Sequence, residues 1–183
     1  MTKRLTLLLL LPLLLSTLAQ AQNNEAAPEV EHLAPLIGTW KIHQERMNPQ
    51  GQWTKQPGAP IWSFEWAMGG HAILDRWESK VLNPATQDSI PSHGINLRTY
   101  DAKAEKWQVV WVENTTHKFI HFEGTSEPGE FRMEGINSSG RLARIRFFDF
   151  KPDSFKWEQA WTFDNSKTWV VVSRMDATRL TEK

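Results

Sequence analysis

From Gly38 onward, apolar and polar side chains alternate in short segments separated by clusters of glycine, proline, asparagine and aspartate. A period of two is typical of strands that bury one face. In the first such segment, Trp40 and Ile42 fall on one face, and Asn48-Pro49-Gln50-Gly51 ends it as a turn. The alternation predicts strands at 38–46, 61–68, 71–81, 94–101, 107–113, 118–125, 130–136, 141–150, 155–164 and 168–177.

The connections between these segments favour a meander, because most are short and polar, as in hairpins. None is long enough for the helical crossover that parallel strands need. Residues 53–60 are irregular, Gly69-Gly70 predicts a tight hairpin turn, and residues 83–93, which include Pro84 and Pro91, form the longest loop and the expected mobile rim. Closure removes the two edges of a long meander. The sequence therefore predicts an all-β fold, an antiparallel up-and-down (meander) β-barrel of about ten strands.

The N-terminus has the pattern of a secretory signal peptide. Lys3 and Arg4 precede an apolar run over 7–18, and Ala19-Gln20-Ala21 has the small-x-small spacing of a cleavage site. The run is shorter than the roughly 20 residues that a membrane-spanning helix needs. We therefore expect a signal peptide over 1–21 and an exported protein, periplasmic or secreted, with no membrane contact after its removal.

The segment between this signal and the first strand divides in two. Residues 22–28 are polar and are expected to be a disordered leader. Residues 29–37 carry apolar side chains at helical spacing, which predicts a short N-terminal helix, limited by Pro35 and plugging one barrel end. Residues 29–183 then form a single barrel domain.

Three motifs carry a resemblance to a known superfamily. Leu36-Ile37-Gly38-Thr39-Trp40-Lys41-Ile42 resembles the Gly-x-Trp first strand of the calycin superfamily, which holds the lipocalins and fatty-acid-binding proteins. Ala177-Thr178-Arg179-Leu180 resembles their last strand, whose arginine packs across that tryptophan. Trp66-Ala67-Met68-Gly69-Gly70-His71-Ala72-Ile73-Leu74 resembles the Gly-Gly hairpin of exported bacterial lipocalin-like domains. The resemblance implies a lipocalin-like barrel.

The chain also departs from relatives whose ligands are known. Residues 48–60 are too short and too rich in proline for the helical pair of fatty-acid-binding proteins, and their carboxylate-binding Arg-x-Tyr is replaced by Arg179-Leu180-Thr181. Nitrobindin barrels bind haem through a late histidine, whereas no histidine follows His121 here. We therefore expect no cofactor.

Composition narrows the partners. The 21 basic and 21 acidic side chains balance, and the loss of Lys3 and Arg4 leaves the exported chain close to neutral, so we expect no nucleic-acid partner. The chain has no cysteine, so the fold has no disulfides and thiol chemistry is excluded. It has ten tryptophans, which can fill a barrel, line a pocket or stack on sugars. We expect a monomer or homodimer.

The candidate ligand site is an aromatic lining inside the barrel. A barrel of this size can enclose a small molecule, and a few polar groups in an aromatic wall are typical of such sites. His71, Asp75 and Trp77 share one face of their segment and show that polar side chains are set among apolar ones. The residues on alternating faces that could converge are Trp62, Phe64, Trp66, Trp111, His121, Trp157 and Trp161. They predict a non-catalytic protein that binds a small apolar or amphipathic ligand.

A second hypothesis is an exported enzyme or a carbohydrate-binding domain that uses the tryptophans as stacking platforms. His121 and Glu123 lie on one face of their segment, which suits acid–base chemistry, or a metal site with His71 or His117 as a third ligand. The sequence contains no nucleophile elbow, phosphate-binding glycine loop or His-Glu-x-x-His motif. We therefore expect no catalytic residues and no metal.

Overall fold

The computed structural model describes residues 26–82, 86, 88–164 and 166–181. The expected signal peptide and most of the leader lie outside these residues. Two 3₁₀ helices, η1 (Pro28–Leu36) and η2 (Met68–Gly70), accompany the strands, and no helix of the described part is long and apolar enough to cross a membrane. The strands are β1 (Gly38–Met47), β2 (Trp53–Lys55), β3 (Ile61–Ala67), β4 (Ala72–Leu82), β5 (Ser89–Asp101), β6 (Lys106–Glu113), β7 (Ile120–Glu127), β8 (Glu130–Ile136), β9 (Leu142–Lys151), β10 (Ser154–Trp161) and β11 (Val170–Arg179).

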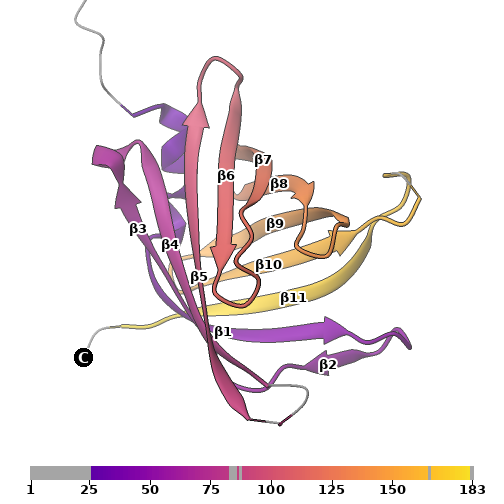
Figure 1. Ribbon diagram of the computed structural model, residues 1–183. Helices are drawn as coiled ribbons and strands as arrows, with labels where there is room; N and C mark the ends of the chain where they lie inside the picture. The colour runs from indigo at the N-terminus through magenta and orange to yellow at the C-terminus, as the bar shows by residue number, and fades with distance from the viewer. Residues whose placement is uncertain (1–25, 83–85, 87, 165, 182–183) are drawn as a thin grey trace, which may run out of the picture.

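The strands form one closed antiparallel barrel. Each of β3 to β10 pairs with the next strand along the chain, and β1 pairs with both β3 and β11. Ten strands thus close the barrel, and β2 adds an extra strand beside the distal half of β1 (Figure 1). The predicted all-β meander barrel of about ten strands is confirmed.

The closure depends on Arg179, the last residue of β11. Its guanidinium lies 4.0 Å from the centre of the Trp40 ring, and its Nη1 donates to the carbonyl oxygen of Ile37 at 2.7 Å. Gly38 makes room for this arrangement, because a Cβ there would lie 2.3 Å from Nη1 of Arg179. Trp40 Nε1 in turn donates to the carbonyl oxygen of Leu36 at 2.7 Å. The expected stacking of an arginine on Trp40 is therefore confirmed for Arg179.

The N-terminal helix closes one end of the barrel. Val30, Leu33 and Leu36 of η1 are buried in the core, as their helical spacing predicts, and η1 contacts β5, β7 and β8. At its edge, Nδ1 of His32 is hydrogen-bonded to Oγ of Ser126 at 3.0 Å. Figure 1 shows η1 at the end where the β5–β6 hairpin turns. η1 therefore covers the core at this end of the barrel.

An aromatic cluster fills the closed half of the barrel. The ring of Trp62 lies 4.9 Å from that of Phe64, 5.4 Å from Phe147 and 6.3 Å from Phe155, and Trp40 meets Phe155 edge-on at 4.8 Å. Edge and tilted contacts of this kind stabilise a core beyond the area they bury. These rings come from β1, β3, β9 and β10, so one cluster joins strands that are distant in sequence.

The main departure from the predicted elements is in residues 83–93. The structure extends β5 back to Ser89, so 89–93 are strand rather than loop, while 83–85 and 87 lie outside the described residues. The prolines suggested a loop, but Pro91 pairs with Lys80 of β4 beyond the end of the β5–β6 ladder, which stops at Gly94. A proline is tolerated there because an edge strand does not need its N–H on the free side.

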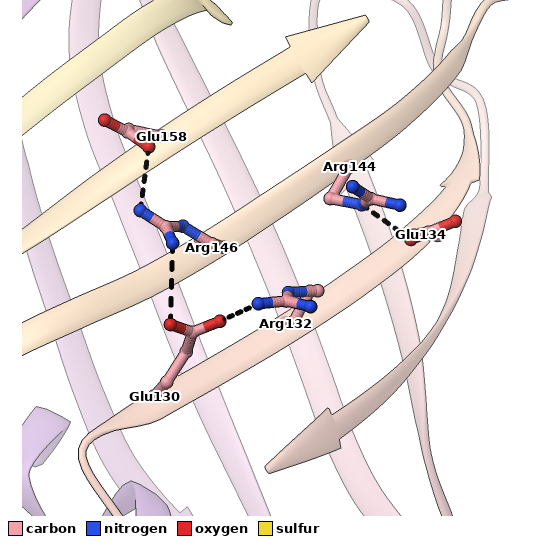
Figure 2. A network of polar contacts seen from close by, with 6 residues as sticks. All are labelled: Glu130, Arg132, Glu134, Arg144, Arg146 and Glu158. Carbon is pink, nitrogen blue, oxygen red and sulfur yellow. Dashed lines mark hydrogen bonds and ion pairs between the residues drawn. The ribbon is translucent and has the colours of Figure 1, made fainter. Parts of the chain in front are cut away.

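The outer face of β8, β9 and β10 carries alternating charges (Figure 2), from Glu130, Arg132, Glu134, Arg144, Arg146 and Glu158. Arg146 lies between two acids, with Nη1 3.6 Å from Glu130 and Nη2 3.2 Å from Glu158. Such partly exposed ion pairs each contribute little to stability. They mark this face as the solvated outside of the barrel.

Candidate functional site

The inner face of the barrel changes character along its length. At the η1 end, Trp40, Trp107 and Phe131 are fully buried. At the opposite end, where β1–β2, β4–β5, β6–β7, β8–β9 and β10–β11 are connected, Trp77 and Trp111 are only half-buried. Polar side chains first occur on the inner face between these two zones. We call the zone that contains Trp77 and Trp111 the open end.

The floor of the open end is a buried ion pair between adjacent strands. Asp75 of β4 and Arg98 of β5 are both fully buried, and Nη1 of Arg98 donates to Oδ2 of Asp75. The other carboxylate oxygen accepts a hydrogen bond from Trp62 Nε1 at 2.6 Å. The amide of Asn96, oriented to satisfy both neighbours, accepts from Arg98 Nη2 at 2.9 Å and donates to the carbonyl oxygen of Val110 at 3.0 Å. A polar chain thus crosses the aromatic core from β3 to β6.

Burial perturbs this guanidinium without removing its charge at neutral pH. Desolvation lowers the pKa of Arg98 to about 9. Its Cζ lies 5.3 Å from the centre of the Phe147 ring and 5.5 Å from that of Phe64, so ring faces replace part of its hydration. Among the described residues, its Nε has no hydrogen-bond partner. The aromatic floor is therefore polar at one point and apolar around it.

Two tryptophans form one wall above this floor. Trp77 of β4 meets Trp62 edge-on at 5.4 Å, and its Nε1 donates to Oγ of Ser79 at 3.0 Å. The indole of Trp111 lies over Gly94, where a Cβ would come within 2.0 Å of Trp111 Cη2. Gly94 pairs with Trp77 across the β4–β5 ladder, so one small residue gives space to a neighbouring indole. Trp111 is thereby seated on the inner face.

The other wall comes from β10, β11 and β1. Trp161 and Gln159 pair with Ala143 and Ile145 of β9, both buried, so the register places them on the inner face. Across the same wall, Gln44 Nε2 donates to Oγ of buried Ser173 at 3.1 Å. Nε1 of Trp161 is buried and has no partner among the described residues. This wall therefore offers an indole, amides and a hydroxyl.

Charges of opposite sign meet at the mouth. Partial burial lowers the pKa of Arg46 on β1, while the nearby carboxylate of Glu113 on β6 opposes that shift. Glu113 Oε1 also accepts a hydrogen bond from Thr116 Oγ1 at 3.4 Å. β1 and β6 are not neighbours in the sheet, so this electrostatic contact spans the opening.

The structure brings five of the seven expected lining residues into this arrangement. Trp62, Phe64 and Trp157 belong to the buried core beneath the open end, with exposed fractions of 5%, 3% and 7%. Trp111 and Trp161 lie on its half-buried walls. The expected lining residues thus divide into a buried group, Trp62, Phe64 and Trp157, and a half-buried group, Trp111 and Trp161.

The other two expected lining residues lie elsewhere. Trp66 is at the end of β3 beside η2, at the η1 end of the barrel, and is 41% exposed. His121 lies on the outer face, because Ile120 and Phe122 on either side of it fill the interior. The alternation around His121 was ambiguous because Phe119 made both faces look apolar, but Phe119 is itself exposed.

His121 belongs to a shallow outer groove of about 500 Å³ over β6, β7 and β8. Within it, Lys106 Nζ lies 2.8 Å from Glu123 Oε2, and this contact lowers the pKa of Glu123 and raises that of Lys106. A carboxylate held ionised in this way is a poor general acid. No group of three or more His, Asp or Glu side chains that could hold a metal occurs within the described residues.

Sequence reasoning missed the partner of Asp75. Asp75 stood out as a polar residue on an apolar face, but Arg98 gave no comparable signal in a segment that also holds Asn96 and Thr99. The pairing requires the β4–β5 register, in which Asp75 is opposite Asn96 and Ile73 opposite Arg98. An unpaired inward aspartate was itself the available signal, since a buried charge needs a partner.

Comparisons with known proteins agree with this architecture. The family profile described as "Protein of unknown function (DUF1579)" matches residues 25–183. No curated protein matches the sequence. The S-type phycobiliprotein lyase CPES from Guillardia theta is similar in structure, with a TM-score of 0.58, 14% sequence identity, 84% of this chain covered and 93% of that chain. Rv2717c from M. tuberculosis also gives a TM-score of 0.58, at 11% identity over 86% of this chain and 100% of that chain. These similarities show a calycin-like fold.

Proposed function

The chain belongs to the DUF1579 family, and we propose that it is a non-catalytic binding protein for a small apolar or amphipathic molecule. The ligand lies at the open end of the barrel, against the indoles of Trp77, Trp111 and Trp161. The single observation that carries the proposal is the position of these three tryptophans. They are on the inner face yet not buried, beside amide and hydroxyl groups that can orient a ligand.

The seating of Trp111 supports a preformed site. Its ring occupies the space that the side chain of any other residue at position 94 would fill, so the indole lies against the wall. A wall that is already ordered loses little side-chain entropy when a ligand binds. Nε1 of Trp161 is buried and has no partner among the described residues. It is therefore available to donate a hydrogen bond to a ligand oxygen or ring nitrogen.

One protein that shares the fold has a named activity. The similar structure from Guillardia theta is named a phycobiliprotein lyase. At 14% identity this likeness concerns the fold. The choice of an apolar or amphipathic ligand rests on the side chains of this chain.

The observations favour this proposal over the enzyme and carbohydrate hypotheses. Glu123 is held by Lys106, and His121 lies outside the barrel, so neither reaches the open end. The outward tryptophans, Trp53 and Trp169, are each covered by an arginine, Arg174 and Arg144. They therefore do not form the exposed row of indoles that sugar stacking requires.

A binding titration with matched variants tests the proposal. N-phenyl-1-naphthylamine, a neutral apolar dye that brightens in an apolar site, should bind with micromolar affinity and quench tryptophan emission. Trp111→Ala and Trp161→Ala should each weaken binding roughly tenfold, as truncation of an aromatic anchor does. Trp53→Ala, on the outside of β2, is the matched control and should leave the affinity unchanged. Undiminished binding in both inner variants, with urea unfolding showing them folded, would overturn the proposal.

Export completes the proposal. It rests on the pattern of residues 1–21, with its basic start, apolar run and small-residue cleavage site. Intact-mass measurement of the protein purified from its own host should give a chain beginning at Gln22. A chain that retains the apolar run would instead be anchored or unprocessed, and the export proposal would fail.

A further inference from the structure

Large apolar side chains are exposed on three consecutive connections at the open end. Phe119 precedes β7 and is 70% exposed, Ile136 ends β8 and is 55% exposed, and Phe163 follows β10 and is 63% exposed. The β6–β7, β8–β9 and β10–β11 connections share one end because the barrel is an up-and-down meander (Figure 1). Exposed apolar residues that gather in this way mark an interaction surface.

Contacts between the connections make these side chains one patch. Lys118, next to Phe119, extends its Nζ to the carbonyl oxygen of Ser138 in the β8–β9 connection at 3.5 Å. From the end of that connection, the guanidinium of Arg141 stacks on Phe163 with Cζ 5.3 Å from the ring centre. We call Phe119, Ile136 and Phe163, with Lys118, Arg141 and the exposed Lys167, the rim patch.

The rim patch is cationic as well as apolar. In the same connection as Phe163, Asp164 accepts hydrogen bonds from the backbone N–H of Thr168 at 2.8 Å and from the hydroxyl of Thr168 at 2.7 Å. These hydrogen bonds lower the pKa of Asp164, so its carboxylate stays ionised, and they hold it within its own loop beside the three cations of the patch. Glu113 is likewise turned toward Thr116. A chain with balanced charge overall thus presents lysines and an arginine around exposed phenylalanines.

We propose that the rim patch docks the barrel on an anionic lipid surface, with Phe119, Ile136 and Phe163 inserted among the headgroups. Apolar side chains at loop tips, flanked by lysine and arginine, match the layered polarity of a membrane interface and its negative surface potential. Docking in this orientation would place the open end of the barrel against the lipid. This goes beyond the binding function proposed above and replaces the expectation, drawn from the sequence, of no membrane contact.

Vesicle cosedimentation with the protein from its own host tests this inference. Binding to phosphatidylcholine vesicles that contain a share of phosphatidylglycerol should exceed binding to pure phosphatidylcholine at least tenfold, because the patch carries several cations. Phe119→Ser and Phe163→Ser should each weaken binding to the anionic vesicles by about tenfold, since each removes one inserted ring. Met68→Ser is the matched control, because Met68 is 64% exposed at the opposite end of the barrel and should be neutral on substitution.

The charge component has its own variant and its own readout. Lys118→Gln keeps a hydrogen-bond donor for Ser138 but removes the charge, so it should reduce the preference for anionic vesicles while leaving dye binding at the open end unchanged. All variants share one N-terminus, so differences between them report on the patch alone.

Three results would overturn the inference. The first is no binding to either vesicle by the wild-type chain. The second is binding that Met68→Ser weakens as much as Phe119→Ser does. The third is a concentration-dependent dimer, seen by light scattering, that Phe119→Ser dissociates, because the patch would then be covered by a second copy. If the wild-type chain binds the anionic vesicles but does not bind the dye, the proposed function fails and this inference stands.

Discussion

Replacing one member of the Asp75–Arg98 pair at a time should destabilise the barrel far more than replacing both. Each single variant, Asp75→Asn or Arg98→Met, leaves a fully buried charge without its counter-charge. Breaking a buried pair in this way costs about 3–5 kcal/mol. Because a domain of this size has about 5–15 kcal/mol of stability in total, either loss is a large fraction of it.

The double variant Asp75→Asn/Arg98→Met should lose only about 1–2 kcal/mol, since it removes both charges together and forfeits little more than a hydrogen bond. Asparagine keeps a carbonyl oxygen for Trp62 Nε1, which donates to Asp75 at 2.6 Å. Methionine keeps most of the volume among the phenylalanine rings that Arg98 faces. The hydrogen bond from Arg98 to Asn96 is lost only in the variants that replace Arg98.

Urea unfolding, followed by circular dichroism and by tryptophan emission, measures the free energy of unfolding of all four proteins. Coincident transitions from the two probes establish two-state behaviour, and an unchanged denaturant slope validates the comparison. We expect a large favourable coupling between the two positions. Losses that add, with the double variant as unstable as the two single variants combined, would show that the two side chains do not act as a buried pair.

Three further predictions concern the closure and the outer groove. Trp40→Ala should lower the free energy of unfolding by about 3–5 kcal/mol, as large aromatic truncations in cores do, and a loss below about 1 kcal/mol would contradict its role in closing the barrel. Gly38→Ala should lower the free energy of unfolding by about 1–3 kcal/mol, because φ at this position is +127° and the added Cβ would meet Arg179. An equal loss in an Arg179→Ala background would show that the contact with Arg179 contributes nothing to it. Lys106→Gln should raise the pKa of Glu123, followed by NMR. Because the pKa of Glu123 is lowered in the folded state, the ion pair stabilises the fold at pH values above the pKa of Glu123 in the unfolded chain, and this stabilisation is lost as the pH falls through the pKa in the folded state. An unchanged pKa of Glu123 in Lys106→Gln would show that Lys106 does not hold the carboxylate.

Much of the fold was predictable from local patterns. The period-two alternation located the strands because each one buries a single face, and the short connections required antiparallel neighbours. The packing of Arg179 on Trp40 followed instead from the resemblance of the Gly-x-Trp and Ala-Thr-Arg-Leu motifs to the first and last strands of the calycin superfamily. The strand positions are encoded within segments of about ten residues, so no long-range information was needed for them.

The inner and outer faces were harder to distinguish where both carry apolar residues. His121 was expected inside because it shares a face of its segment with Phe119, yet Phe119 is exposed on the rim. Arg98 was not expected inside at all, because its burial depends on Asp75 in another strand. Strand register and the ion-pair partner of a buried charge both depend on residues far apart in the sequence, and the pattern within one segment does not specify them.

The division between buried and half-buried tryptophans was also outside the reach of the sequence. Trp62 and Trp111 are the same residue type in similar alternating segments. What separates them is their neighbours: Trp62 lies among the rings of the core, and Trp111 lies over Gly94. The position along a barrel axis follows from strand tilt and register, which alternation does not specify.

The location of the ligand is the central claim, and indole NMR tests it most directly. Each tryptophan contributes one Nε1–H signal to a ¹⁵N-correlation spectrum, and phenylalanine substitutions assign the signals. Titration with N-phenyl-1-naphthylamine should shift the signals of Trp77, Trp111 and Trp161 and leave those of Trp53 and Trp169, on the outside, in place. Shifts confined to Trp53 and Trp169, or an unchanged spectrum at saturating dye, would contradict binding at the open end of the barrel.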